Sequence, residues 1–243
     1  MEEVLIEKET LYVLPERHFH LFYSLIPNSI IYNTDLPSYI RKKLIKEREK
    51  ELKKLNIRNR IVENVLKKYN PKVIFLEGDS SVASYRKNLH PHLNFYKLVS
   101  LDEGCEPYEN FCKEYELIHE KYKKETEKCF NENRYDKIPS LVYKRKVEEA
   151  NIFKKYSDDS PREGYWFKVI KENYENPSLL ICGAGHFLTL RTLYFILLNS
   201  NNPLLYIGLW KIWKDKMKGK ISILPNLLER IGIKTIVVDY LYA

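Results

Sequence analysis

A short apolar run followed by two glycines and a histidine, LLICGAGHF at residues 179–187, restricts the folds open to this chain more than any other stretch. An unbroken run of Leu, Ile and Cys is typical of a strand covered on both faces, as in the parallel sheets of α/β proteins. Gly183 and Gly185 allow the backbone to turn sharply or to approach a ligand closely. We therefore expect His186 at the carboxyl end of a buried strand, where open α/β sheets bind ligands.

A second segment, near the N-terminus, has the same layout. Residues 12–19, YVLPERHF, can be laid over residues 180–187 without a gap, and the His-Phe pair is identical in both. Each segment consists of an apolar strand end, a turn residue, two further residues and the histidine. We predict that His18 and His186 both leave strand ends and enter the same cleft.

Strands and helices alternate along the chain, which predicts an α/β fold with a mostly parallel sheet and helices on both faces. The 243 residues suffice for one such domain, spanning residues 1–243. Residues 106–160 are predicted to be a helical insert or cap within it. A charged helix is expected to end near Leu55, where Asn56 separates it from a second helix that ends at Tyr69. A short helix is expected at 19–26, and strands at 11–14, 73–76, 95–101, 179–182, 204–207 and 235–238.

Composition and charge narrow the function classes. The net charge of +8 permits a polyanion partner, but acids and bases are mixed in residues 41–54, which favours a solvated helix face over nucleic-acid binding. His186 and Arg191 interrupt the apolar stretch 179–198, which indicates a buried core segment rather than a membrane span. The N-terminus has no signal-peptide pattern, and the four cysteines have no metal-site spacing. We therefore expect a cytoplasmic protein with reduced thiols.

Acidic side chains follow several of the predicted strands. Glu16, Glu77, Asp79, Asp102 and Glu103 all lie at or just after a strand end. Because the carboxyl ends of parallel strands share one edge of the sheet, these acids are predicted to meet the histidines there. A histidine beside a carboxylate forms a general acid–base pair, and two histidines with carboxylates also form a divalent metal site. Asp79 also suits the N-cap of a helix, and Glu77 a solvated surface.

The same edge is predicted to bind a small-molecule substrate or ligand. A serine nucleophile is not expected, because the chain has no GxSxG motif, and Cys182 lies within the apolar run, where packing is the simpler role. The residues expected to contact the substrate are Asp79, Asp102, Glu103, Gly183 and Gly185.

Four short motifs, in their order along the chain, resemble those of a known superfamily. PERH at residues 15–18 resembles the GExH-type motif of the erythromycin-esterase/ChaN-like proteins. GAGH at 183–186 is similar to the GxxH motif that this group shares with TraB and the Tiki-type proteases. Residues 73–79 resemble the strand that ends in the family's second acidic position, and Arg162-Glu163 resembles its Arg/Glu element. The resemblance spans about residues 10–198, and it departs from the family at Pro15, where a glycine is usual.

The resemblance implies a hydrolase that activates water at the strand ends. The esterase branch uses a histidine and glutamates for this step. The Tiki-type branch uses a divalent metal such as Zn, Mn, Fe or Co, which here would bind to His18, Glu77 and His186. The alternative is a non-catalytic protein of the same fold that binds a small ligand or cofactor. The catalytic residues that the resemblance implies are Glu16, His18, Glu77 and His186, supported by Arg162 and Glu163.

Overall fold

The computed structural model describes residues 9–16, 38–156, 158–183, 186 and 222–238. The helix expected at 19–26 and the strand expected at 204–207 lie outside these residues. The described elements are β1 (Thr10–Glu16), α2 (Ser38–Tyr69), β2 (Val73–Leu76), α3 (Ser80–Leu89), the 3₁₀ helix η2 (Pro91–Phe95), β3 (Lys97–Ser100), α4 (Glu106–Asn131), η3 (Tyr135–Lys137), α5 (Ile138–Lys155), α6 (Ser160–Asn173), β4 (Ser178–Gly183), α9 (Leu224–Arg230) and β5 (Lys234–Val237).

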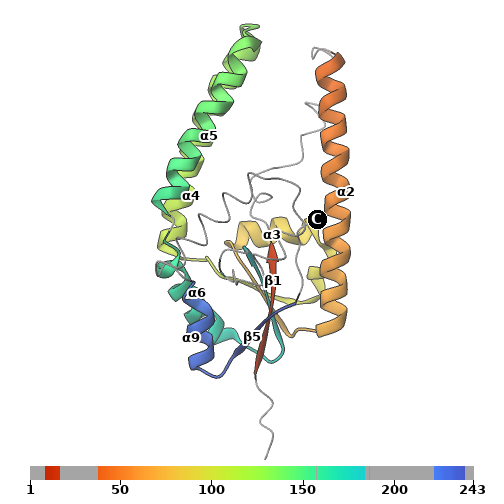
Figure 1. Cartoon of the computed structure of the whole chain (residues 1–243), viewed down its shortest axis with the longest axis vertical. Coiled ribbons are helices and arrows are strands. Elements are labelled where there is room, and N and C mark those ends of the chain that lie inside the picture. Colours follow the sequence, from red (N-terminus) through yellow and green to blue (C-terminus); the bar gives the residue numbers. More distant parts are fainter. Residues whose placement is uncertain (1–8, 17–37, 157, 184–185, 187–221, 239–243) are drawn as a thin grey trace, which may run out of the picture.

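The described strands form one sheet with the order β3-β2-β4-β1-β5, and every pairing is parallel. β1 and β4, the two strands that precede the repeated His-Phe pair, are direct neighbours, with Glu16 opposite Gly183. Their register is one residue away from the gap-free alignment of the two segments, since Tyr12 pairs with Leu179. The predicted α/β fold with a parallel sheet is confirmed, and the ends of β1 and β4 lie side by side (Figure 1).

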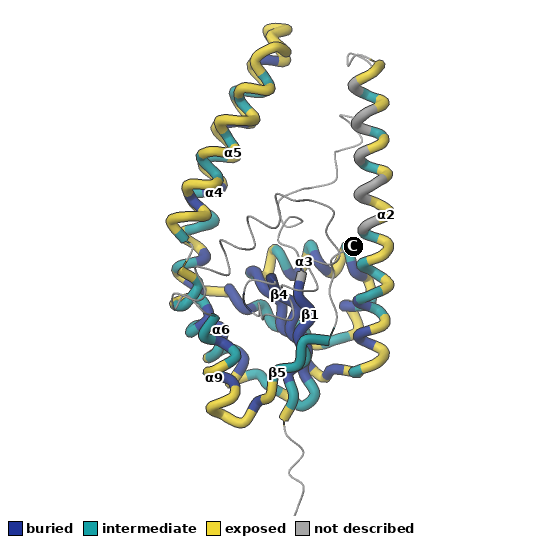
Figure 2. The backbone as a smooth tube through the Cα atoms, viewed as in Figure 1, coloured by how far each residue is buried: buried dark blue, intermediate teal, exposed yellow. Residues whose placement is uncertain are grey.

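Helices cover both faces of the sheet, as alternation along the strands requires. On one face, Val73 and Phe75 of β2 pack with Trp166 of α6 and with residues of α9. On the other face, Ile74 and Leu76 pack with residues of α2 and α3. Side chains of a strand point alternately to the two faces, so a strand buried on both faces is apolar except where a polar side chain finds a partner, as Ser178 does by donating to the carbonyl of Glu175. This explains the unbroken apolar runs of β2 and β4, whose residues are all buried (Figure 2).

α2 is one continuous helix, so the predicted break at Asn56 is wrong. Asparagine in a helix interior costs only about 0.7 kcal/mol relative to alanine, and tertiary packing readily outweighs it. Here the packing comes from Val62, Val65 and Leu66, which are buried against the sheet. The strand predicted from residue 95 begins only at Lys97, because residues 91–95 form the 3₁₀ helix η2.

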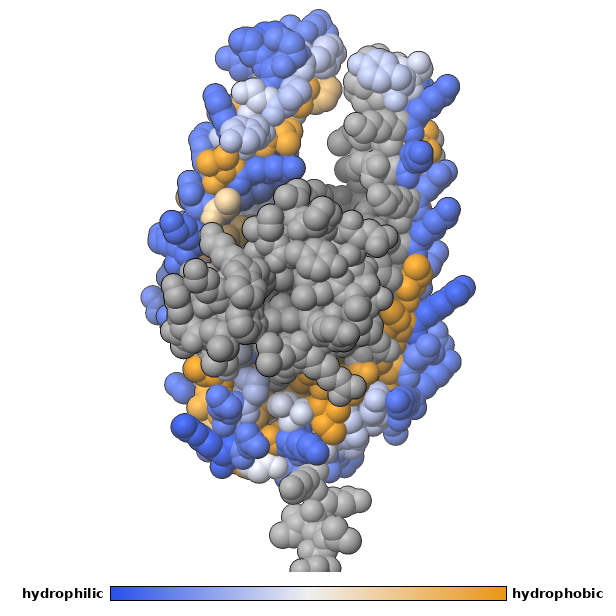
Figure 3. Space-filling model, viewed as in Figure 1, coloured by the Kyte–Doolittle hydropathy of each residue, from blue (hydrophilic) through white to orange (hydrophobic). Residues whose placement is uncertain are grey.

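The insert at 106–160 consists mainly of a helical hairpin. α4 and α5 run side by side and rise beyond the edge of the sheet at which the strands end (Figure 1). They are joined by aromatic contacts, such as Phe111 with Phe153 at 5.5 Å, and by the hydrogen bond from Tyr122 to Glu148. α2 rises on the opposite side, and hydrophilic side chains cover its outer edge (Figure 3). In the described part of the chain, no helix is long and apolar enough to cross a membrane.

Candidate functional site

The carboxyl edge of the sheet gathers a cluster of buried ionisable side chains. Glu77 follows β2, Asp102 follows β3, and His186 lies three residues after β4. Glu77, Glu163 and His186 are each 1% exposed, and Asp102 is 0% exposed. Buried charges are costly unless they are paired, so the contacts within this cluster decide what it can do.

The first turn of α6 brings a second set of groups to the same edge. Asp159 precedes the helix, Pro161 lies in its first turn, and the amide of Glu163 donates to the carbonyl of Asp159. Proline suits this position because its fixed φ and missing N–H fit the start of a helix. Residues three or four apart share one helix face, so Asp159, Arg162, Glu163 and Trp166 are presented together.

His186 lies between two carboxylates. Its Nδ1 is 2.8 Å from Oε1 of Glu163, its Nε2 is 3.6 Å from Oε1 of Glu77, and its ring lies 4.4 Å from that of Trp166. Burial alone would lower the pKa of His186, but the contacts with Glu163 and Glu77 outweigh it and raise the pKa from 6.5 to about 10. The imidazole is therefore held in its protonated, cationic form near neutral pH.

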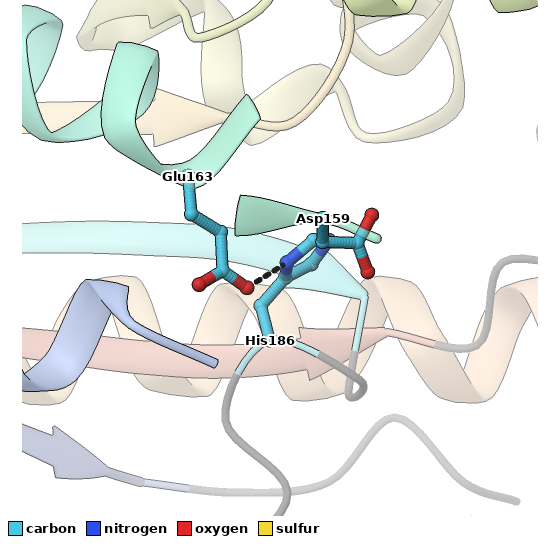
Figure 4. A group of neighbouring side chains, drawn as sticks. All are labelled: Asp159, Glu163 and His186. Atoms are coloured by element: carbon cyan, nitrogen blue, oxygen red, sulfur yellow. Dashed lines mark hydrogen bonds and ion pairs between the residues drawn. The ribbon is translucent and has the colours of Figure 1, made fainter. Parts of the chain in front are cut away.

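The carboxylate of Glu163 connects two distant parts of the chain, and Figure 4 shows the first of these contacts, the bond to His186. While its Oε1 receives Nδ1–H of His186, its Oε2 accepts hydrogen bonds from Ser222 Oγ at 3.0 Å and from the amides of Ile223 and Leu224 at 2.6 and 3.1 Å. Glu163 therefore fixes the orientation of the imidazole and the start of α9 at the same time.

Arg162 and Asp102 form a two-pronged ion pair. Nε and Nη2 of Arg162 donate to the two oxygens of Asp102 at 2.7 and 2.6 Å. Asp102 also accepts from Trp166 Nε1 and from the amide of Gly78, both at 2.7 Å. Burial would lower the pKa of Arg162, but Glu77 and Asp102 raise it above its ordinary value, so the guanidinium stays charged. It lies 4.9 Å from the ring of Tyr108 and 4.8 Å from that of Trp166.

Glu77 joins the histidine to the arginine. Its Oε1 is 2.9 Å from Nη2 of Arg162 and 3.6 Å from Nε2 of His186, and its Oε2 accepts a hydrogen bond from the amide of Gly183. The alternative of a solvated Glu77 is therefore wrong. Gly183 contributes its backbone N–H, which fixes Glu77 at the end of β4.

Comparisons of the chain with known proteins found no relative. No family model, no curated protein and no solved structure matches the chain. The resemblance drawn from the four motifs therefore stays a prediction, and the chemistry of the site is argued from its own side chains.

Two predicted site residues are engaged at the start of α3. Asp79 is the N-cap of this helix, accepting from the amides of Ser81 and Val82 at 3.0 Å. The exposed Glu103 accepts from the amide of Ser80 at 2.8 Å. Both carboxylates satisfy backbone donors that a helix start leaves open. The alternative role of Asp79 as a helix cap is therefore confirmed.

The remaining predicted residues are placed only in part. Glu16 ends β1 opposite Gly183, but its side chain is not among those described. His18 and Gly185 lie outside the described residues. The relation between the two histidines therefore stays a prediction.

Sequence reasoning missed Asp159 and Trp166. Asp159 is partly buried, and its pKa is raised, mainly by burial. Trp166 donates to Asp102 and packs against His186. The signal was present in the spacing: Asp159 precedes Glu163 by four residues, and Trp166 follows Arg162 by four, so both share the helix face of that pair.

Three residues of the cluster could hold a metal ion. Asp159, Glu163 and His186 each offer a ligand atom, and these atoms lie within 4.8 Å of one another (Figure 4). Imidazole and carboxylate groups suit Zn, Mn and Fe. This set shares only His186 with the metal ligands that the resemblance implies. Within the described residues, the cluster places the carboxylates of Glu77, Asp102, Asp159 and Glu163 against the basic groups of Arg162 and His186.

Proposed function

We propose that this protein is a hydrolase that activates water at the carboxyl edge of its sheet. The observation that carries the proposal is that the imidazole of His186 contacts the carboxylates of both Glu163 and Glu77, next to the partly buried Asp159. Acid–base catalysis needs neighbouring groups with pKa values displaced in ways that suit opposite tasks. Here His186 is held protonated and can donate a proton, while the raised pKa of the neighbouring Asp159 makes its carboxylate a better proton acceptor.

The two groups take different parts in the proposed reaction. His186 is the general acid, because its raised pKa keeps a proton available for a leaving group. Asp159 is the general base, because burial raises the pKa of its carboxyl and so makes the carboxylate a stronger proton acceptor. Glu163 orients the imidazole through Nδ1, as carboxylates do for catalytic histidines.

Arg162 supports the site by position and charge. Its side chain is 16% exposed, whereas Glu77 and Asp102 on either side of it are almost fully buried. Because both carboxylates hold the guanidinium, it stays in place as negative charge develops on a substrate. The bonds that this site could hydrolyse are ester, amide and phosphoester bonds.

A divalent metal is compatible with the same residues. The cluster has more carboxylates than basic groups, and a bound cation offsets such an excess. Asp159, Glu163 and His186 would hold the ion, with the imidazole giving up its proton on binding, and a bound metal would supply Lewis acidity and a lower pKa for a water molecule. Glu163 would keep its bonds to the start of α9 in either case.

A non-catalytic ligand-binding protein is the second candidate. The saturation of the buried carboxylates favours it, because Asp102 and Glu163 each accept hydrogen bonds from several protein donors. Groups that are already satisfied are well suited to shape a site and less suited to bind a reacting atom.

Elemental analysis and a substrate panel separate these possibilities. Purified protein is analysed for bound metal beside the variants His186→Gln and Asp159→Asn, with Asp158→Asn as the control because Asp158 is the exposed neighbour. The same proteins are assayed on ester, amide and phosphodiester substrates, with chelator and after metal add-back. We expect turnover that falls at least about 100-fold in the first two variants and is unchanged in the control. Absence of turnover on every substrate, with and without metal, would refute the hydrolase and leave the binding protein.

A further inference from the structure

The excess of basic over acidic residues in this protein is concentrated on one helix. α2 contains twelve lysine and arginine residues against four glutamates, an excess of eight, and the net charge of the whole chain is +8. The rest of the chain is therefore balanced. The α4–α5 hairpin illustrates this balance, because ion pairs such as Lys121–Glu148 and Lys155–Glu114 join its two helices.

Four of these cations form a row on the exposed side of α2. Lys46, Lys53, Arg60 and Lys67 are all exposed and follow one another at intervals of seven residues. Seven residues make almost two helical turns, so the row drifts by only about 20° per interval. With a rise of 1.5 Å per residue, it spans about 31 Å. We call these four residues the basic row.

Only part of the helix that carries the row packs into the core of the described structure. Between residues 38 and 60, none of the described side chains is buried. Only the last part of α2 packs on the sheet, through Val62, Val65 and Leu66. Figure 3 shows hydrophilic side chains along the outer edge of this helix. The helix therefore presents basic side chains to solvent at regular intervals. The last of them, Lys67, also pairs with Glu63 at 2.5 Å, and the exposed Glu49 lies between the first two.

We propose that the basic row is a docking surface for the phosphate backbone of a double-stranded nucleic acid. A duplex is a stiff, regular polyanion, and basic side chains bind it by neutralising phosphates and releasing counterions. The length of the row, about 31 Å, is close to the rise of about 34 Å for one turn of a duplex. Phosphate contacts of this kind position a protein without specifying sequence.

Two other polyanion partners fit less well. A helix that binds a membrane surface needs a broad apolar face to insert. The exposed aliphatic side chains described on α2, Leu52 and Ile57, stand among charged residues, whereas Val62, Val65 and Leu66 are buried on the sheet. Single-stranded nucleic acid is usually held by aromatic side chains on which bases stack, and the basic row has none.

The structure also changes the interpretation of the charged segment. Residues 41–54 alone show mixed charges, which favoured a solvated face. Because α2 continues without a break to Tyr69, it adds Arg58, Arg60, Lys67 and Lys68 against Glu63 alone. The row becomes apparent only on the full helix.

The test measures binding of the full chain to a fluorescent duplex DNA of about 20 base pairs and mixed sequence, between about 50 and 200 mM salt. The variant carries Lys46→Glu, Lys53→Glu and Arg60→Glu. We expect its affinity to fall at least about tenfold at the lower salt. Its salt slope should fall by about two to three, because three phosphate contacts are lost.

A matched control changes the net charge by the same amount elsewhere. It carries Lys113→Glu, Lys124→Glu and Lys146→Glu, three exposed positions on the α4–α5 hairpin. We expect its affinity to stay within about threefold of wild type, because binding depends on the row and not on the total charge. Circular dichroism confirms that both variants are folded, and glutamine replaces glutamate at the same positions if one is not.

Three results would overturn the proposal. The first is no binding of duplex DNA or duplex RNA at about 50 mM salt with micromolar protein. The second is an equal loss of affinity in both variants, and the third is tighter binding to vesicles of anionic lipid or to a single strand than to a duplex. None of them bears on the hydrolase site, because the basic row and the buried cluster share no residue.

Discussion

The pH dependence of stability tests the placement of His186 between its two carboxylates. Burial lowers the pKa of His186, but Glu163 and Glu77 raise it from 6.5 to about 10 in the folded protein. Since the folded pKa is the higher one, the stabilisation is fully present below pH 6.5 and is lost as the pH rises towards 10. From pH 6.5 to 8.5 the unfolded chain releases the proton while the folded protein keeps it. The unfolding free energy should therefore fall by about 2 kcal/mol over this interval.

Urea denaturation followed by circular dichroism at pH 6.5, 7.5 and 8.5 measures this fall. The interval stops at 8.5 because burial raises the pKa values of Cys105 and Cys112, which adds a loss of the same sign at higher pH. The variant His186→Gln should show less than about a third of the fall, whereas His119→Gln, at an exposed position on α4, should keep all of it. A flat wild-type profile, or an undiminished fall in His186→Gln, would refute the reasoning.

Three further predictions concern stability, each measured by urea unfolding. Asp102→Asn should lower the free energy of unfolding by about 3–5 kcal/mol, because Arg162 then lacks the charge of its buried partner. The control Asp136→Asn, at an exposed position, should change it by no more than about 0.5 kcal/mol, and equal effects would contradict the buried ion pair. Gly78→Ala should lower the free energy of unfolding by at least about 2 kcal/mol, because φ is 108° and the new Cβ would lie 2.5 Å from Cγ1 of Val82. Gly164→Ala, whose Cβ would have nothing within 4 Å, should instead stabilise α6 by about 0.5–1 kcal/mol. Effects of the same sign at both sites would count against this. Asp79→Ala should cost about 1 kcal/mol through loss of the α3 cap, and Asp79→Ser should restore most of it; no recovery with serine would argue against capping.

The fold was largely predictable because burial on both faces leaves a plain trace in the sequence. A strand covered on two sides has few polar positions, so the apolar runs 73–76 and 179–182 were recognisable as parallel strands. The continuity of α2 was not predictable. The local cost of Asn56 is small, and packing contacts that no local pattern reports decide whether the helix continues.

The site was predictable where topology alone decides it. Parallel strands bring their carboxyl ends together, so Glu77 and His186 were expected at one edge. The different roles of Asp79 and Asp102 were not predictable, because both residues follow a strand. Only the direction of each side chain makes Asp79 a helix cap and Asp102 a buried ion-pair partner. The four-residue spacing places Asp159 on the helix face of Glu163, but only the packing of α6 against the sheet shows that this face meets His186, and so Asp159 was missed.

The double engagement of Glu163 has a consequence for how this chain can vary. One carboxylate holds His186 through Oε1 and Ser222 through Oε2, so the chain closes on itself at these two points. Because one side chain serves both partners, the two contacts are not lost independently by a change at this position. Any substitution that removes the carboxylate of Glu163 releases the imidazole and the start of α9 together.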